Sequence, residues 1–196
     1  MFYRDLILTV ERRDRMYFVT QLMTLVHEHY SALNCAVAFP GWKDGEQSSL
    51  DSFDTFTRYA DVGDVIRLFA DNEAALAQAL TVMGLEELVA KRVIIATPVK
   101  PAPTSPLAAA FCRVRSADSL GRRVSRASSA EQREKLKEAV RANSHKTAYF
   151  RVLDKSGNHQ RPIVFTRVCG GAASGNVACN SFGFSSVSAP CYLPDF

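Results

Sequence analysis

The chain has 196 residues, of which 47% are hydrophobic and 22% are charged, so it can bury the core of one globular domain or of two small ones. Its net charge of +4 conceals an asymmetry, because residues 1–100 carry 10 Lys and Arg against 14 Asp and Glu, whereas residues 101–196 carry 14 against 6. The lack of a long apolar run and of a signal-peptide pattern argues against membrane insertion and secretion.

Residues 1–100 show strand and helix patterns in the order βαββαβ. Strands are predicted at 2–10, 35–42, 64–70 and 91–99, where apolar and β-branched residues alternate or cluster. Helices are predicted at 17–33 and 71–89, the second beginning with Asp71 or Asn72 as its N-cap. This is the ferredoxin-like arrangement, which many RNA-binding domains share, and residues 45–52 are expected to form a loop within it.

The segment KPAPTSP (100–106) is predicted to mark a domain boundary, because its three prolines cannot continue a sheet. Residues 101–196 then form a basic C-terminal region. A charged helix is expected at 128–143, and two strands at 147–154 and 161–168 flank the turn KSGN. We therefore predict an α+β protein with a ferredoxin-like domain (1–100) and an RNA-binding C-terminal region (101–196) that contains an arginine-rich helix and a small β element.

Five arginines and a single acidic residue lie between residues 113 and 126. Arg113 and Arg115 alternate in a segment that is expected to be extended, which places both side chains on one face. Arg122, Arg123 and Arg126 fall on one side of an expected helix, since positions three and four apart are neighbours. We expect the first pair to read base edges and the other three to hold phosphates; a solvated surface helix is the alternative.

The cysteines and histidines do not form a metal-ligand pattern. Five cysteines are scattered, odd in number and free of CxxC, which favours reduced thiols in the cytoplasm over a disulfide framework or a zinc site: Cys35, Cys112, Cys169, Cys179 and Cys191. No cluster of His, Asp and Glu has ligand spacing. The sequence therefore predicts no metal and no cofactor.

Three motifs resemble, in the right order, the repeat-processing endoribonucleases of type I-F CRISPR systems, the Csy family. VAFPGW (37–42) is similar to the G-V-S-F-P strand of that family, and RVRS (113–116) to its base-reading linker, which precedes an arginine-rich helix. SFGFS (181–185) is similar to its Y-G-L-S motif. The resemblance spans most of the chain and agrees with the βαββαβ pattern and the charge asymmetry.

The resemblance implies an enzyme of antiviral defence that binds the hairpin of a CRISPR repeat and cuts precursor RNA at the base of the stem without metal. The upstream ribose 2′-hydroxyl is the nucleophile in that family, so the product ends in a 2′,3′-cyclic phosphate. The enzyme then stays bound to the mature crRNA, together with other subunits of the type I-F effector complex. Histidine suits this chemistry because imidazole exchanges protons near neutral pH.

The chain departs from the family pattern at three positions. Arg115 stands where the family often has glutamine, which implies a different base preference. Phe182 stands where the family has the tyrosine of Y-G-L-S, which removes a hydroxyl that could orient the histidine or the ribose. Gln160 falls about where a phenylalanine stacks on the terminal base pair of the stem, and the neighbouring His159 could replace it.

Two histidines are candidates for the general base. With about 100° of rotation per residue, Leu22, Val26 and Leu33 define an apolar stripe on the expected helix. His29 falls on this stripe, which is typical of a hydrogen-bonded core residue, whereas His27 lies on its flank. The family's catalytic histidine also follows a core residue off the stripe, so the resemblance favours His27, with His29 as the alternative.

Two other functions remain open at the level of sequence. The first is a subunit that caps the guide-RNA hairpin without cutting it, which the missing tyrosine hydroxyl at Phe182 favours. The second is an unrelated ferredoxin-like RNA-binding protein, which would bind diverse RNAs, whereas the endoribonuclease and the capping subunit require one hairpin.

Overall fold

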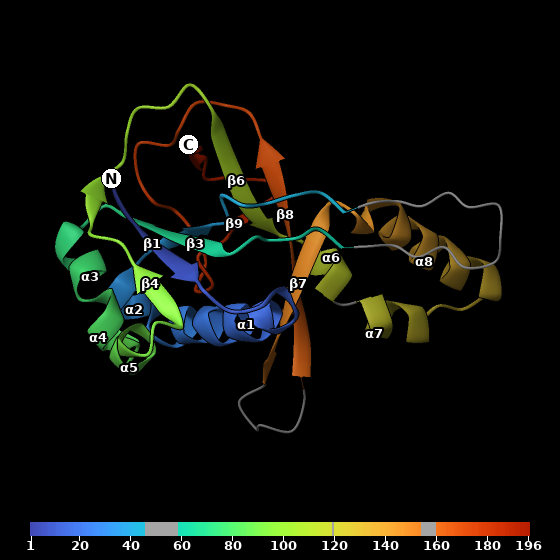
Figure 1. Ribbon diagram of the computed structural model, residues 1–196. Helices are drawn as coiled ribbons and strands as arrows, with labels where there is room; N and C mark the ends of the chain where they lie inside the picture. Colours follow the sequence, from blue (N-terminus) through green and yellow to red (C-terminus); the bar gives the residue numbers. More distant parts are fainter. Residues whose placement is uncertain (46–58, 119, 154–159) are drawn as a thin grey trace.

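A computed structural model describes residues 1–45, 59–118, 120–153 and 160–196, and within them the chain forms two mainly antiparallel sheets with helices beside them (Figure 1). The predicted α+β class is confirmed. The loop predicted at 45–52 and the turn KSGN lie almost entirely outside the described residues. No helix among the described residues combines the length and apolar character needed to cross a membrane.

The first sheet is built from the N-terminal half of the chain. It comprises β1 (Phe2–Leu8), β2 (Ala36–Ala38), β3 (Val65–Ala70), β4 (Ile94–Ala96) and β5 (Lys100–Pro101). Its strand order is β2-β3-β1-β4, all antiparallel, and β5 extends the pairing of β1 beyond β4. The four strands predicted in this half are therefore confirmed.

The prediction that KPAPTSP cannot continue a sheet is wrong for its first two residues. Lys100 and Pro101 pair with Tyr3 and Phe2 at the end of β1. Proline is tolerated there because β5 is a short strand at the edge of the sheet, where a missing N–H donor leaves no neighbour unpaired. The division of the chain at this segment stays a prediction. The first sheet ends with the first two residues of the segment, and the second sheet begins after its last residue.

Five helices accompany the first sheet and lie on one side of it in Figure 1. They are α1 (Arg12–Glu28), α2 (Tyr30–Leu33), α3 (Glu73–Ala77), α4 (Ala79–Val82) and α5 (Glu86–Ala90). The helix predicted from residue 17 begins earlier, at Arg12, and breaks at His29. The second predicted helix is divided into α3, α4 and α5, and Asn72 is its N-cap, since its side chain accepts a hydrogen bond from the Ala74 amide.

The second sheet is built from the C-terminal half. It comprises β6 (Ala108–Arg113), β7 (Thr147–Leu153), β8 (Gln160–Cys169), β9 (Ser185–Ser186) and β10 (Leu193–Pro194). The order is β10-β6-β8-β7, and β9 pairs with β6 in parallel. The strands β7 and β8 are the predicted antiparallel pair, which is confirmed.

Three helices follow β6 and extend away from both sheets in Figure 1: α6 (Arg115–Asp118), α7 (Leu120–Ser125) and α8 (Ala130–Ser144). A serine pair separates α7 from α8. The Ser129 hydroxyl accepts a hydrogen bond from the Gln132 amide, and the Gln132 side chain accepts one from the Ser128 amide. This reciprocal capping starts a new helix, and the predicted charged helix is confirmed as α8.

A cluster of buried aromatic rings joins the two sheets. Phe39 follows β2, and its ring stacks on Phe165 of β8 with 5.2 Å between centroids. Phe165 in turn stacks on Phe184 at 4.6 Å, and Phe111 of β6 meets Phe39 edge-on at 5.4 Å. Because the buried residues of both sheets belong to one hydrophobic core, the C-terminal segment around Phe184 is held against β2 and α1.

Candidate functional site

His27 lies on the last turn of α1, directly after a buried residue. Val19, Leu22, Met23 and Val26 form the buried face of this helix. His27 is exposed, as its position on the flank of the apolar stripe predicts. The helix therefore presents an accessible imidazole on a backbone that is anchored in the core.

A tight loop at residues 180–184 meets this imidazole. The Asn180 side-chain oxygen accepts hydrogen bonds from the Phe182 amide at 2.8 Å and the Phe184 amide at 3.4 Å, which closes the loop on itself. Gly183 has φ +74°, a conformation that favours glycine, and its carbonyl accepts a hydrogen bond from the Val37 amide of β2 at 2.9 Å. The loop is thus fixed to the edge of the first sheet.

This loop gives His27 two partners. The His27 Nδ1 atom lies 2.8 Å from the Ser181 hydroxyl oxygen, and the imidazole stacks on the Phe182 ring with 4.1 Å between centroids and 14° between planes. The Phe182 ring is 5% exposed, so it is a firm support. One hydrogen bond and one stacked ring fix both the direction and the plane of the imidazole.

Ser181 supplies a hydroxyl in place of the one that is absent at Phe182. When Nδ1–H donates to Ser181 Oγ, the lone pair resides on Nε2, which has no hydrogen-bond partner among the described residues. In this tautomer Nε2 can accept a proton from a substrate hydroxyl. The arrangement is suited to general base catalysis on a molecule that approaches from solvent.

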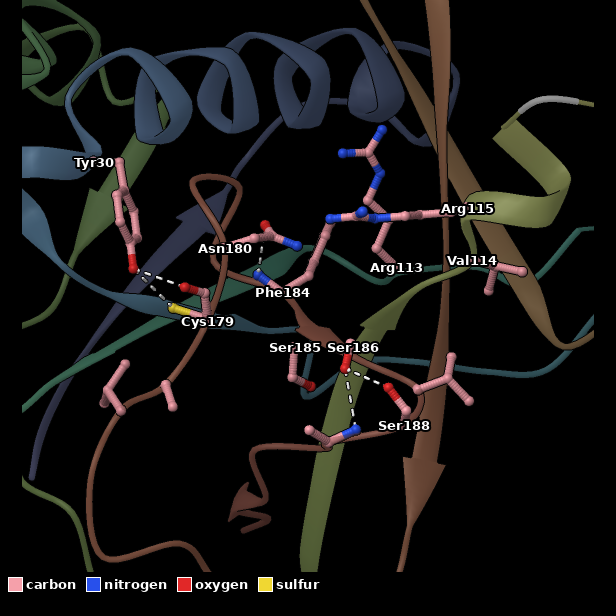
Figure 2. A pocket seen from close by; sticks show the side chains of 14 residues that line it. Tyr30, Arg113, Val114, Arg115, Cys179, Asn180, Phe184, Ser185, Ser186 and Ser188 are labelled. Atoms are coloured by element: carbon pink, nitrogen blue, oxygen red, sulfur yellow. Dashed lines mark hydrogen bonds between the residues drawn. The ribbon is translucent and has the colours of Figure 1, made fainter.

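Arg113 connects this histidine to a groove. Its guanidinium carbon lies 5.6 Å from the centre of the Phe182 ring, on which His27 is stacked. Arg113 and Arg115 both line this groove (Figure 2). Arg113 thus shares the Phe182 ring with His27 and, together with Arg115, lines a neighbouring groove that is suited to a phosphate.

The groove has a volume of about 960 Å³. Its walls come from the end of β6, the start of α6, residue Tyr30 and two C-terminal segments, 177–180 and 184–189. Hydroxyl groups line one part: Ser186 Oγ lies 3.1 Å from Ser188 Oγ and accepts a hydrogen bond from the Ala189 amide (Figure 2). The groove therefore offers arginine donors at one end and serine hydroxyls at the other.

The prediction that Arg113 and Arg115 share an extended segment is wrong for Arg115. β6 ends at Arg113, and α6 begins at Arg115, because the Val114 carbonyl accepts the first bond of the helical turn from the Ala117 amide. Both side chains nevertheless line the same groove. The turn after β6, and not the alternation of side chains along a strand, brings the two arginines to this groove.

Of the other three arginines, Arg123 and Arg126 are not among the residues that line the groove. Arg122 and Arg123 belong to α7, and Arg126 follows directly after its end, so the expected single helical face is interrupted. Arg123 and Arg126 are exposed, and the Arg122 side chain lies outside the described part. The predicted assignment of these residues to phosphates stays a prediction.

Of the remaining histidines, His29 is only half-buried, so its predicted place in the core is wrong. α1 ends at Glu28, and the chain turns at His29, whose carbonyl accepts hydrogen bonds from the Ala32 and Leu33 amides at 3.0 Å. This turn breaks the helical phase on which the prediction rested. His29 has a structural role through its backbone, and His159 lies outside the described residues.

A phenol and a thiol form the far wall of the groove (Figure 2). The Tyr30 hydroxyl donates to the Cys179 carbonyl at 2.8 Å, and burial raises the pKa of Tyr30 to about 12, with neighbouring Cys179 adding to the rise. Burial also raises the pKa of the Cys179 thiol to about 11 and that of Cys35 to about 12. All three groups are therefore neutral at physiological pH, and neither thiol is an activated nucleophile.

We expect the thiols to differ sharply in reactivity. Iodoacetamide near pH 8 should alkylate the exposed Cys169 first, whereas Cys35 and Cys179 should react only after unfolding, because little thiolate forms when the pKa is raised. Peptide mass spectrometry of briefly treated protein, with and without denaturant, measures this. Alkylation of Cys179 as fast as Cys169 in the folded protein would contradict the described environment.

Sequence reasoning missed Ser181, Asn180 and Tyr30. The run N-S-F-G-F carries a turn signal, because asparagine closes such loops and glycine adopts positive φ. The contact between Ser181 and His27, however, joins residues 154 positions apart, which local patterns do not indicate. Among the described residues there is no group of three or more His, Cys, Asp and Glu that could hold a metal ion. No family model matches the chain, and no curated protein matches its sequence.

Proposed function

We propose that this chain is a metal-independent endoribonuclease that binds the hairpin of a CRISPR repeat, cleaves precursor crRNA at the base of the stem and stays bound to the product within a type I-F effector complex. The observation that carries the proposal is the His27 site: an exposed imidazole is oriented by Ser181 and Phe182, and Arg113, over the same Phe182 ring, lines a neighbouring groove with Arg115. The resemblance of RVRS and SFGFS to the Csy family falls on this same site.

The chemistry follows from the positions of these groups. Nε2 of His27 takes the proton of the ribose 2′-hydroxyl, whose oxygen attacks the adjacent phosphorus. The bond from phosphorus to the 5′-oxygen breaks, and the leaving oxygen takes a proton from solvent, which leaves a 2′,3′-cyclic phosphate on one product and a 5′-hydroxyl on the other. Arg113 and Arg115, which the sequence predicts to read base edges, hold the RNA in the groove near this histidine.

The fold supports an RNA-binding function of this kind. The antiparallel order β2-β3-β1-β4, with helices on one side, agrees with the ferredoxin-like arrangement that we infer for residues 1–100. The excess of positive charge in residues 101–196 lies on the half of the chain that contributes β6, α6 and α7. A basic surface of this kind attracts a nucleic-acid backbone.

A subunit that caps the hairpin without cutting it is the second candidate. The observation that favours it is Phe182, a ring without a hydroxyl, packed directly on His27. A site of this type could hold RNA between the arginines and the imidazole without proton transfer. Cleavage separates the two candidates.

The experiment is incubation of a labelled type I-F repeat hairpin with the protein in EDTA. We expect cleavage at one position with the same rate as in magnesium, because proton transfer by His27 does not involve a metal ion. Strict dependence on magnesium would overturn the mechanism. Tight binding without cleavage under all conditions would establish the capping function instead.

The basic helices should contribute affinity without sequence preference. Replacing Arg123 and Arg126 by alanine should weaken binding of all stem-loops and lower the slope of log K against log salt by about 0.9 for each phosphate that is no longer neutralised. The double variant Lys135→Ala, Lys137→Ala is the matched control, since both lysines already pair with glutamates on α8. Equal effects of the two double variants would refute a specific role for α7.

A further inference from the structure

A second pocket lies at the opposite end of α1 from His27. It has a volume of about 440 Å³, and it lies between the first turns of α1, the segment after β2 and the segment before β3. Three cations line it, Arg12, Arg15 and Lys43, together with two carboxylates and the ring of Tyr59. Its residues take no part in the His27 site.

The ion pairs of this pocket leave cationic groups available. Asp61 pairs with Arg12 at 3.0 Å and with Arg15 at 3.4 Å, so one carboxylate is shared between two guanidinium groups. Lys43 is exposed and has no ion pair among the described residues. A site with a surplus of positive charge and a shared counter-ion is suited to an external anion.

One residue of this lining carries a buried polar atom without a partner in the described part of the chain. Arg15 Nε is buried and has no hydrogen-bond partner among the described residues, although arginine nitrogens in such positions are normally paired. The backbone before β7 is tied to the same wall, since the His145 carbonyl accepts a hydrogen bond from the amide of Gly45, which lines the pocket. An unsatisfied guanidinium nitrogen in the wall of a cationic cavity points to a polar ligand.

An exposed aromatic ring completes the pocket. Tyr59 is 49% exposed, and its ring is held edge-on against Tyr149 of β7, with 4.9 Å between centroids and 71° between planes. A tyrosine that is fixed at one edge and open on one side can stack on a base. Cations that contact a backbone and an aromatic platform for bases are the combination by which proteins bind single-stranded nucleic acid.

We propose that this pocket binds a nucleotide of single-stranded RNA, with its phosphate held by Arg15 and Lys43 and its base stacked on Tyr59. The proposal rests on the proposed function only in taking RNA as the ligand. With a rise of 1.5 Å per residue, Arg15 and His27 lie about 18 Å apart along α1, a distance that a few nucleotides can span. The pocket thus binds RNA that flanks the hairpin, not the cleaved phosphate.

The test uses a type I-F repeat hairpin extended by about eight nucleotides of 4-thiouridine-substituted oligouridine, and the same hairpin without the extension. Irradiation should crosslink the extension to Tyr59, as mapped by peptide mass spectrometry. Lys43→Gln should weaken binding of the extended RNA by about threefold to tenfold and lower its salt slope by about 0.7. Tyr59→Ala should weaken it about tenfold, and neither variant should change binding of the bare hairpin.

Lys100→Gln is the matched control, because Lys100 is exposed on β5 and loses the same charge far from the pocket. Crosslinks confined to the groove or to α6–α8 would overturn the pocket and leave the proposed function intact. A loss of affinity for the extended RNA in Lys43→Gln, without any loss in Tyr59→Ala, would overturn the base-stacking role. That result would be expected if the pocket bound anions without bases, such as an acidic protein segment. Crosslinking of free oligouridine to Tyr59, without any hairpin binding, would support the pocket and refute the proposed function.

Discussion

Replacing His27 by alanine should slow cleavage of the repeat hairpin by about 10²–10⁴-fold, the usual effect of losing a general acid or base. Binding should change little, because the exposed ring contributes few core contacts and Arg113 and Arg115 remain in place. Single-turnover cleavage and equilibrium binding on the same RNA separate the two quantities. Thermal melting should show a fold close to that of the wild type.

Two further variants sharpen this test. Ser181→Ala should slow cleavage by up to about 10²-fold, because the imidazole loses the bond that sets its direction, and Ser181→Thr should restore most of the rate. His29→Ala should keep its activity and lose about 1 kcal/mol of stability, since this residue is half-buried at a helix junction. A stable but inactive His29→Ala protein would show that the wrong histidine has been assigned.

Gly183→Ala, a substitution in the loop at residues 180–184, should lower the free energy of unfolding by about 2–5 kcal/mol. This is a large effect for one added methyl group. The residue has φ +74°, which costs an L-residue roughly 1–2 kcal/mol. A Cβ atom there would lie 2.5 Å from Val37 Cγ2 and 3.0 Å from the Val37 amide nitrogen, and such overpacking costs about 1–3 kcal/mol more. Because the loop carries Ser181 and Phe182, cleavage should fall with it.

Gly84→Ala separates the two contributions. Gly84 has φ +64°, but nothing lies within 4 Å of an added Cβ atom, so only the backbone cost of roughly 1–2 kcal/mol applies. Urea denaturation of both variants gives the comparison. Equal losses at the two positions would show that the Gly183 loop is not packed against β2 as described.

Local patterns predicted the elements of the first sheet, because short alternating strands and a capped helix depend on nearby residues. The break at His29 was not predicted, because the apolar spacing continues past it to Leu33. The division of the second helix coincides with Gly84, whose φ of +64° favours glycine, so a local signal for it was present in the sequence. The sequence predicted β6 as part of an extended segment but did not predict that it ends at Arg113. The turn after β6 depends on the hydrogen bond that the Val114 amide donates to β8, a contact between residues distant in sequence.

The candidate site was only half predictable. Helical phase predicted that His27 is exposed, because the spacing of apolar residues distinguishes the buried face of a helix from its flanks. Ser181 was not predictable, since its contact with His27 requires the C-terminal loop to be fixed against β2 by Asn180 and Gly183. Phe182 was identified as a lost hydroxyl, whereas the structure gives its ring a positive role as the support of the imidazole.

The most direct measurement of the central claim uses a repeat hairpin with a single 2′-deoxy substitution at the nucleotide on the 5′ side of the mapped cut. If His27 removes a proton from that 2′-hydroxyl, the substituted RNA should bind normally and remain uncut in EDTA, and the unsubstituted RNA should yield a product whose mass includes a 2′,3′-cyclic phosphate. Cleavage of the 2′-deoxy RNA at the normal rate, or a product ending in a 3′-hydroxyl, would contradict the account.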